Sequence, residues 1–487
     1  MNRKLSCLVL LCSISAAAQT TSKLAGNPPD APSQVAFDLR LTQLASDSLP
    51  QAATPQAGSA QQGQAAPGNT AAGSQTASTG TSVRTLSIKD AEQLAIQNNP
   101  QTTVARLNAL ASAQVIRETR SALWPQANVD LTAVDSHPGS RITAGGLNNP
   151  IIYERAAAGA SVTQLITDFG HTTNLISSAN LAAKAQDQNA IATQEQIRLA
   201  ADQAFYGALQ AHQLTLVGEQ TVNARQTVAD QVQALFTSKL KSQLDLSFAN
   251  VNLSQAKLLL LDAQNNENAA LARLSAVLGF PTLQHFQLVE DTSELAPPPA
   301  NVDDLISQAF TKRPELLALN YDYESAQKFQ TAERELLFPT IRAAGAVGDT
   351  PVRNPALSNW YGAVGVNVDI PVFNGFQYTA RAKEARLRAQ ASQARLTDLR
   401  NRISRDVRTS WLNATTAYNR LSVAKELLDQ SNLALDLAQT RYKIGLSSIV
   451  ELSQAQLQQT QAEINNVQAG YEYRFALADL RFQIAGF

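Results

Sequence analysis

The chain has 487 residues, of which 44% are hydrophobic, and its formal net charge is −1. A nearly neutral chain has no basic surplus for nucleic acid, so we expect no nucleic-acid partner. Both cysteines, Cys7 and Cys12, lie within residues 1–18. The rest of the chain therefore has no thiol for a disulfide, a metal site or covalent catalysis.

Residues 1–18 have the pattern of a secretory signal peptide. The basic residues Arg3 and Lys4 precede an apolar run, and small residues suited to cleavage follow it. The alternative to a cleaved signal peptide is a retained membrane anchor, but the apolar run is short for one. Residues 19–84 are rich in Gln, Ala, Gly, Ser and Thr, a composition typical of a disordered leader.

The remainder of the sequence is an internal duplication. The tripeptides LWP and LFP end at Pro125 and Pro339, and each follows a long Ala/Gln/Glu-rich segment. An earlier pair of prolines repeats at the same spacing, and other residues match in order between them. We predict a first repeat over 85–295 and a second over 300–487, separated by the Pro-rich sequence APPPAN.

Each repeat contains two long stretches with apolar residues at steps of three and four, nearly free of Gly and Pro. A helix of about 65–70 residues would be about 100 Å long at ~1.5 Å per residue. Such helices need neighbours along their whole length, which predicts antiparallel coiled-coil packing. The expected helices span 171–239, 243–278, 377–444 and 448–485.

Four shorter segments alternate small or apolar residues with polar ones. Each is close to the ~9–11 residues that a tilted strand needs to cross a bilayer. Four strands cannot close a barrel alone, and open edges are not tolerated in lipid, so we expect several copies to share one barrel. A soluble sheet is the alternative. The expected strands span 127–134, 157–166, 340–348 and 360–370.

Proline and glycine mark the predicted boundaries between helices and strands. Pro371 cannot donate in a strand ladder, and Gly375 supplies turn chemistry before the next helix. The first repeat has Ile166 in place of Pro371, and we pair Gly170 with Gly375. The complete set of predicted boundary residues is Pro125, Pro339, Pro371, Gly170 and Gly375.

At this point the sequence resembles the TolC-like outer-membrane efflux proteins. The resemblance covers residues 85–487 and is carried by LWP and LFP, by IPVFNGFQYTARAKEARLRAQASQARL, and by RYKIGLSSIVELSQAQLQQTQAE. It implies a mixed, mainly α-helical fold and a homotrimer in which each protomer gives four strands to a 12-stranded barrel in the outer membrane. A long helical tunnel would then cross the periplasm. The implied partners are outer-membrane lipid, a periplasmic adaptor and an inner-membrane pump.

The resemblance also assigns roles near the sequence YKIGLSSIVEL. Gly445 ends the long helix, and Glu451 matches an acidic position at which three copies form a constricted ring. The second acidic position is Gln454 here, which weakens the ring. An ordinary solvated helix carboxylate is the alternative for Glu451.

Tyr442 matches a tyrosine that holds the inner helix pair against its neighbours in this family. Its partner position is Asp245, so a Tyr–Asp hydrogen bond would act as a latch. Alternatively, Tyr442 is only the last apolar residue of its helical stripe. Lys239 takes the place of Gly445 in the first repeat, so the two turns need not be equivalent.

No phosphate-binding loop, zinc-protease helix or serine-nucleophile motif occurs in the sequence. We therefore expect no enzymatic activity and no cofactor. The function predicted by the resemblance is a passive exit duct of a tripartite or type I secretion system, opened like an iris at its periplasmic end. The alternative is a periplasmic coiled-coil protein that binds partners without forming a channel.

Overall fold

The computed structural model describes residues 84–135, 137, 155–284, 286–290, 295–350 and 358–486. Residues 80–487 form one compact unit, and the fold described below is that of this unit. The expected signal peptide, and the expected leader up to residue 83, lie outside the described residues, as do most of the connections between paired strands.

The two halves contain the same succession of elements with helices of equal length. A helix of 11 residues is followed by one of 22, then by two strands, a helix of 67 and a helix of 35. The first half comprises α1 (Ile88–Asn98), α2 (Pro100–Ser121), β2 (Gln126–Val134), β3 (Arg155–Thr167), α3 (His171–Thr237) and α4 (Gln243–Val277). The second comprises α5 (Val302–Lys312), α6 (Pro314–Glu335), β5 (Thr340–Asp349), β6 (Trp360–Asp369), α7 (Gln377–Lys443) and α8 (Ile449–Gln483).

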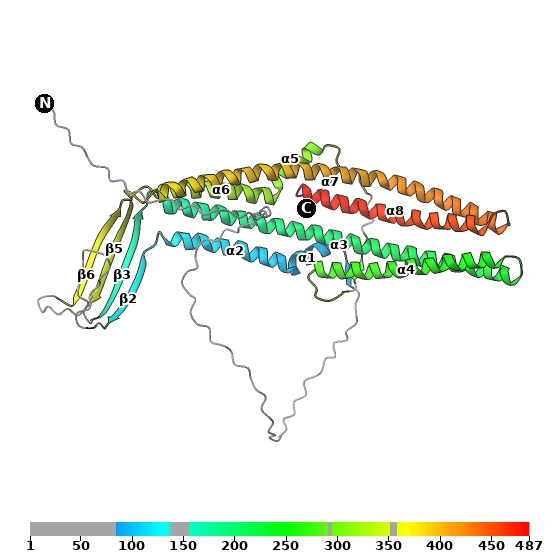
Figure 1. Ribbon diagram of the computed structural model, residues 1–487, viewed down its shortest axis with the longest axis horizontal. Coiled ribbons are helices and arrows are strands. Elements are labelled where there is room, and N and C mark those ends of the chain that lie inside the picture. Colours follow the sequence, from blue (N-terminus) through cyan, green and yellow to red (C-terminus); the bar gives the residue numbers. More distant parts are fainter. Residues whose placement is uncertain are drawn as a thin grey trace, which may run out of the picture. The chain divides into compact units, whose positions relative to one another are not determined.

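The four long strands form one antiparallel sheet in the order β2-β3-β5-β6, so the two halves meet at β3 and β5 (Figure 1). Among the described residues, β2 and β6 are each paired on one side only. Alternate residues of these edge strands, such as Val129 and Leu131 in β2 and Val364 in β6, expose apolar side chains. The sheet therefore has an uncovered apolar face and two open edges.

The two 67-residue helices, α3 and α7, run the length of the helical part, and the shorter helices pack beside them (Figure 1). In the half nearest the strands, the helices pack side by side in the order α2, α3, α6, α7. In the half farther from the strands, α4 packs against α3 in place of α2, and α8 packs against α7 in place of α6. Alanine is the commonest buried residue of α3 and α7, and its small side chain allows close approach of the helix axes. Among the described residues, no helix combines the length and apolar composition needed to cross a membrane.

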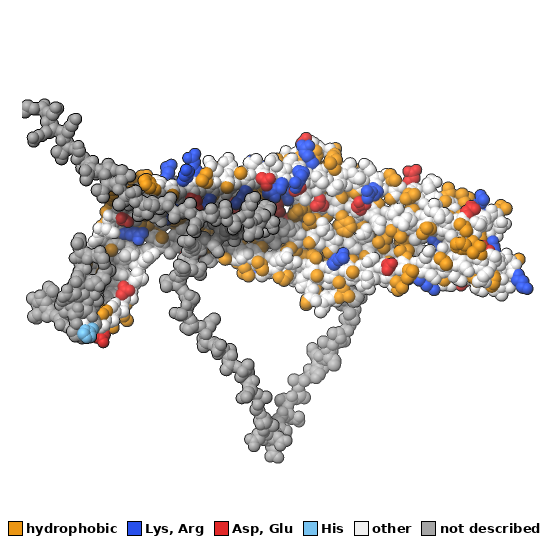
Figure 2. Space-filling view, in the orientation of Figure 1, with side chains coloured by type: hydrophobic (Ala, Val, Ile, Leu, Met, Phe, Trp, Pro, Cys, Tyr) orange, Lys and Arg blue, Asp and Glu red, His pale blue; other side chains and the backbone are white. Residues whose placement is uncertain are grey.

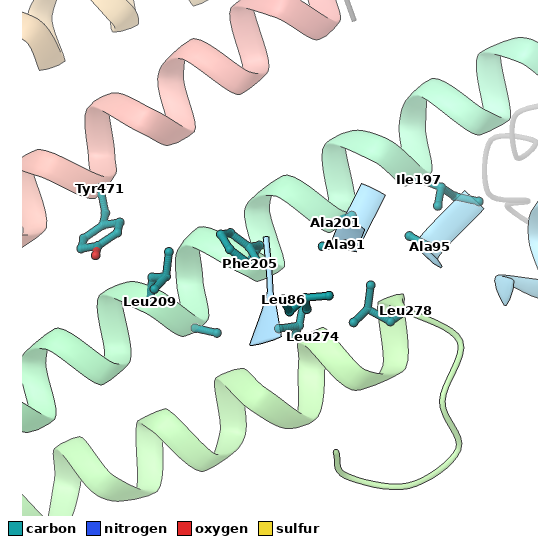
Figure 3. Close-up of a cluster of buried hydrophobic side chains, with 11 residues drawn as sticks. Leu86, Ala91, Ala95, Ile197, Ala201, Phe205, Leu209, Leu274, Leu278 and Tyr471 are labelled. Atoms are coloured by element: carbon teal, nitrogen blue, oxygen red, sulfur yellow. The ribbon is translucent and has the colours of Figure 1, made fainter. Parts of the chain in front are cut away.

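A short parallel pair, β1 (Arg84–Leu86) with β4 (Phe286–Leu288), lies beside the middle of α3. Leu86 belongs to the largest apolar cluster, together with side chains of α1, α3 and α4 such as Phe205 and Leu274. Figure 3 shows these side chains pointing toward one another, with Tyr471 of α8 at the edge of the cluster. This cluster fixes where α4 begins to replace α2 against α3.

Candidate functional site

The turn between α7 and α8 lies at the end of the helices farthest from the strands (Figure 1). Gly445 has φ +81°, and its N–H donates to the carbonyl of Tyr442 at 3.1 Å. The N–H of Leu446 donates to the carbonyl of Arg441 at 2.8 Å. These two bonds form a Schellman motif, in which glycine avoids the steric cost of the left-handed conformation.

The turn between α3 and α4 has the same backbone geometry with a different residue. Lys239 has φ +59°, and the N–H groups of Lys239 and Leu240 donate to Phe236 and Leu235, each at 2.9 Å. The two turns therefore have equivalent backbones although their residues differ. Lysine instead adopts a conformation that costs about 1–2 kcal/mol for a residue with a Cβ atom.

Gly445→Ala is expected to lower stability by about 1 kcal/mol through the left-handed conformation alone. A Cβ atom at this position meets no atom within 4 Å, so packing adds nothing. Gly470→Ala, in the middle of α8 with equal space, is the matched control and should stabilise by about 0.5–1 kcal/mol. Thermal unfolding in detergent would measure both, and shifts of the same sign would contradict the assignment.

Glu451 is the third residue of α8, and its N–H donates to the hydroxyl of Ser448, the N-cap, at 3.3 Å. Its carboxylate lies 3.5 Å from Nε of Arg441, and both side chains are about half exposed. An exposed pair of this kind contributes little to stability. Gln454 is exposed one turn further along α8. Both side chains are thus available on the protomer surface.

Tyr442 is buried among apolar residues of all four helices of the turn region, including Val232, Leu246 and Leu452. Its hydroxyl has no hydrogen-bond partner in the described chain. Burial, and then the nearby charge of Asp245, raise the pKa of Tyr442. The predicted latch hydrogen bond is therefore absent.

Asp245 has a different partner from the expected one because it closes the capping box of α4. Its carboxylate accepts from the hydroxyl and N–H of Ser242, at 2.8 and 3.0 Å. These bonds satisfy donors at the helix start that would otherwise be unpaired. Beside it, Nζ of Lys241 lies 4.1 Å from the ring centroid of Tyr442, within range of a cation–π interaction.

Arg225 of α3 is a buried link that sequence reasoning missed. Its guanidinium donates to the carbonyl of Gln456 at 2.7 Å and to the hydroxyl of Thr460 at 2.9 Å, both on α8. Burial lowers its pKa to about 10. Its helical spacing alone could not distinguish it from a solvated arginine. Together with the cluster around Tyr442, it joins the α3–α4 pair to the α7–α8 pair.

The predicted boundary prolines lie at the ends of strands. Pro125 and Pro339 come immediately before β2 and β5, and Pro371 follows β6 after one residue. Because proline lacks an N–H, it suits a position where the ladder begins or ends. The two "LWP" and "LFP" segments thus occupy the same structural position in both halves.

The glycine boundaries differ between the halves in a way that the sequence comparison did not predict. Gly170, with φ +115°, is the N-cap of α3 and follows Phe169 at φ +55°. In the second half the order is reversed, because Gly375 at φ +62° precedes Phe376, the N-cap of α7 at φ +65°. The pairing of Gly170 with Gly375 was therefore wrong by one position, although both turns need two left-handed residues.

Hydrogen bonds tie the start of α3 to the end of α6. The side-chain amide of Asn174 donates to both oxygens of Glu335, at 3.0 and 2.9 Å. A Cβ atom added to Gly170 would lie only 2.9 Å from an oxygen of the same carboxylate. The nearby carboxylate of Glu333 pairs with Arg381 of α7 at 2.7 Å. The helices α3, α6 and α7 are thus joined to one another at the ends that connect to the strands.

Asp202 of α3 is a buried carboxyl that sequence reasoning also missed. Burial and then the charge of Glu92 raise its pKa from 3.8 to about 7, against the opposing charges of Arg481 and Arg198. The folded state therefore keeps a proton that the unfolded chain loses above pH ~4. The contribution of Asp202 to stability is therefore most favourable below pH ~4 and becomes less favourable as the pH rises toward 7.

Asp202→Asn should remove this pH dependence. The variant's thermal midpoint, relative to the unmodified chain, should rise more at pH 8 than at pH 4.5, because only the ionised carboxylate is penalised. Glu426→Gln, at an exposed position of α7, is the control and should show no such change. An equal effect of Asp202→Asn at both pH values would contradict the assignment.

Long antiparallel helices that continue into an open four-stranded sheet are the fold of solved outer-membrane channels. The family model for outer membrane efflux proteins matches residues 91–280 and 305–486, and the chain belongs to this family. It is thus a protein of the outer membrane. The family is defined by efflux and not by catalysis, which fits the expectation of a non-enzyme.

Individual relatives agree with this assignment. Outer membrane protein TolC of Escherichia coli strain K12 is 22% identical over 396 residues, which are 78% of each chain. The alkaline protease secretion protein AprF of Pseudomonas aeruginosa is 22% identical over 414 residues, 82% of this chain and 84% of that one. The crystal structure of the Campylobacter jejuni CmeC outer membrane channel has the same fold, with a TM-score of 0.71, 16% identity, and coverage of 82% and 85%.

Proposed function

We propose that this chain forms a homotrimeric exit duct, in which four strands from each copy close one 12-stranded barrel in the outer membrane. The observation that carries the proposal is the open sheet. Its apolar face and its edges β2 and β6 need both lipid and further strands. The helices of three copies would enclose a tunnel through the periplasm, and an adaptor and an inner-membrane pump would supply cargo and energy.

The oligomer can be tested directly. Outer membranes extracted with detergent should contain heat-stable trimers of the full chain. A chain that remains fully soluble and monomeric without detergent would support the periplasmic coiled-coil alternative and contradict the duct.

The proposed gate is the α7–α8 turn, where three copies of Glu451 would approach the threefold axis. Three carboxylates close together repel one another and favour cations in the pore. The exposure of Glu451 and Gln454 supports this arrangement because neither side chain is occupied by the core of its own protomer. Glutamine at 454 would leave one acidic ring in place of two.

Glu451→Ala is expected to reduce the preference for cations and to raise single-channel conductance about twofold or more, as the charge that narrows and polarises the aperture is lost. Planar bilayers with asymmetric KCl measure both quantities. Glu426→Ala removes an exposed carboxylate from the third of α7 nearest the turn and should leave cation preference and conductance unchanged. Equal behaviour of the two variants would exclude Glu451 from the aperture.

A further inference from the structure

The ends of α2 and α6 that lead into the strands carry the same pair of exposed side chains in both halves. Trp124 and Phe338 directly precede the boundary prolines and are 67% and 49% exposed. Four residues earlier, Arg120 and Arg334 lie in the last turn of α2 and α6, and both are exposed. Each half thus presents an aromatic ring toward the strands with a cation one helical turn behind it.

The start of α7 repeats this order of aromatic and cation in the opposite chain direction. Phe373 and Phe376 are 76% and 71% exposed, and their ring centroids are 5.6 Å apart. Lys383 and Arg386 follow, about 9 and 14 Å from the helix start at ~1.5 Å per residue. Side chains of a helix tilt toward its N-terminus, which here is the strand end, so these long cations extend toward the sheet.

The four cations are free to bind an external anion. None of them forms an ion pair within the part of the chain that the structure describes. Three of the acids nearby are already engaged: Glu335 accepts from Asn174, Glu333 pairs with Arg381, and Glu384 pairs with Arg388. Figure 2 shows Lys and Arg side chains standing out over the strand-proximal part of α7.

We propose that these residues form an interfacial band that binds anionic phospholipid headgroups of the leaflet facing the helices. The aromatic rings lie where the strands leave the bilayer, a position that such rings favour. The headgroup layer is roughly 7 Å thick, within reach of the cations behind the rings. Cations at this depth attract anionic lipid. The inference rests on the proposed insertion of the strands into the outer membrane. The band comprises Trp124, Phe338, Phe373, Phe376, Arg120, Arg334, Lys383 and Arg386.

The test compares two full-length variants that lose the same amount of positive charge. In the first, all four cations of the band are changed to glutamine. In the second, glutamine replaces four exposed cations farther from the sheet, none of which has an ion pair in the described chain. These control positions are Lys257, Arg400, Lys425 and Lys443.

Trimers in neutral detergent are titrated with short-chain phosphatidylglycerol or phosphatidylcholine, and the shift in thermal midpoint is followed. We expect the unmodified chain and the control variant to prefer phosphatidylglycerol. The band variant should lose roughly tenfold or more of that preference, and high salt should abolish it in all three. Equal preference for phosphatidylglycerol in the band and control variants would overturn the proposal. A band variant that no longer forms trimers but still prefers phosphatidylglycerol would also overturn it. Trimers that conduct in bilayers but show no preference would reject the band alone, and failure to insert would reject the duct itself.

Discussion

Tyr442→Ala is expected to lower stability by about 3–5 kcal/mol and to raise single-channel conductance several-fold. The ring is 7% exposed and packs against α3, α4 and α8 as well as its own helix, so its removal leaves a cavity where the two helix pairs meet. Because these contacts hold the α7–α8 pair in place, the periplasmic end should open more readily. Thermal unfolding in detergent and planar-bilayer recordings measure the two effects.

Tyr442→Phe distinguishes packing from a hydrogen-bonded latch. The hydroxyl has no partner in the described chain, so its removal should leave conductance unchanged and stability equal or slightly higher. An increase in conductance for Tyr442→Phe as large as that for Tyr442→Ala would restore the latch and contradict the packing explanation.

Gly279→Ala is expected to destabilise the chain by about 3 kcal/mol or more. Gly279 follows the C-cap of α4 and has φ +82°, and a Cβ atom there would lie 2.7 Å from the carbonyl oxygen of Asn98. The added Cβ atom would meet the backbone of Asn98. The side-chain amide of the next residue, Asn99, holds this backbone in place by donating to the carbonyl of Val277 at 3.3 Å. Neither side can move without separating α1 from α4.

Gly207→Ala is the control for this substitution. Gly207 lies within α3, and a Cβ atom there meets no other atom within 4 Å, so alanine should be neutral or stabilising by up to ~1 kcal/mol. Thermal unfolding compares the two variants. A midpoint for Gly279→Ala equal to that of the unmodified chain would show that α1 and α4 are not fixed at this point.

The long helices and the strands could be predicted because their patterns are local and repeated. The expected bounds of the four long helices and four strands lie within two residues of those in the structure. An uninterrupted three- and four-residue periodicity leaves little alternative to a helix from 377 onward. Pro125 and Pro339 fixed the strand starts, because a missing N–H has few compatible positions.

The tertiary partners of single polar side chains could not be predicted in the same way. The carboxylate of Asp245 could accept from Ser242 or from Tyr442. Ser242 is only three residues away in the sequence, so the capping box forms in place of a bond to Tyr442. The bonds of Arg225 depend on the rotation of α8 against α3, which no repeat length encodes. The hydrogen bond between Tyr442 and Asp245 that the resemblance implied is therefore absent from the described chain.

We propose that the duct is closed where the α3–α4 and α7–α8 pairs pack together. It is tested most directly by fixing these pairs to each other. Asn252 of α4 donates to the hydroxyl of Ser453 of α8 at 2.7 Å, so both can be changed to cysteine and joined with a short bifunctional maleimide. The sequence has no cysteine after Cys12 to compete.

The measurement is single-channel conductance of this double-cysteine chain carrying Tyr442→Ala, with and without the cross-link. We expect high conductance before cross-linking and a return to the low conductance of the unmodified chain afterwards. Conductance that stays high in the fully cross-linked trimer would show that the duct opens elsewhere and not where these helix pairs meet.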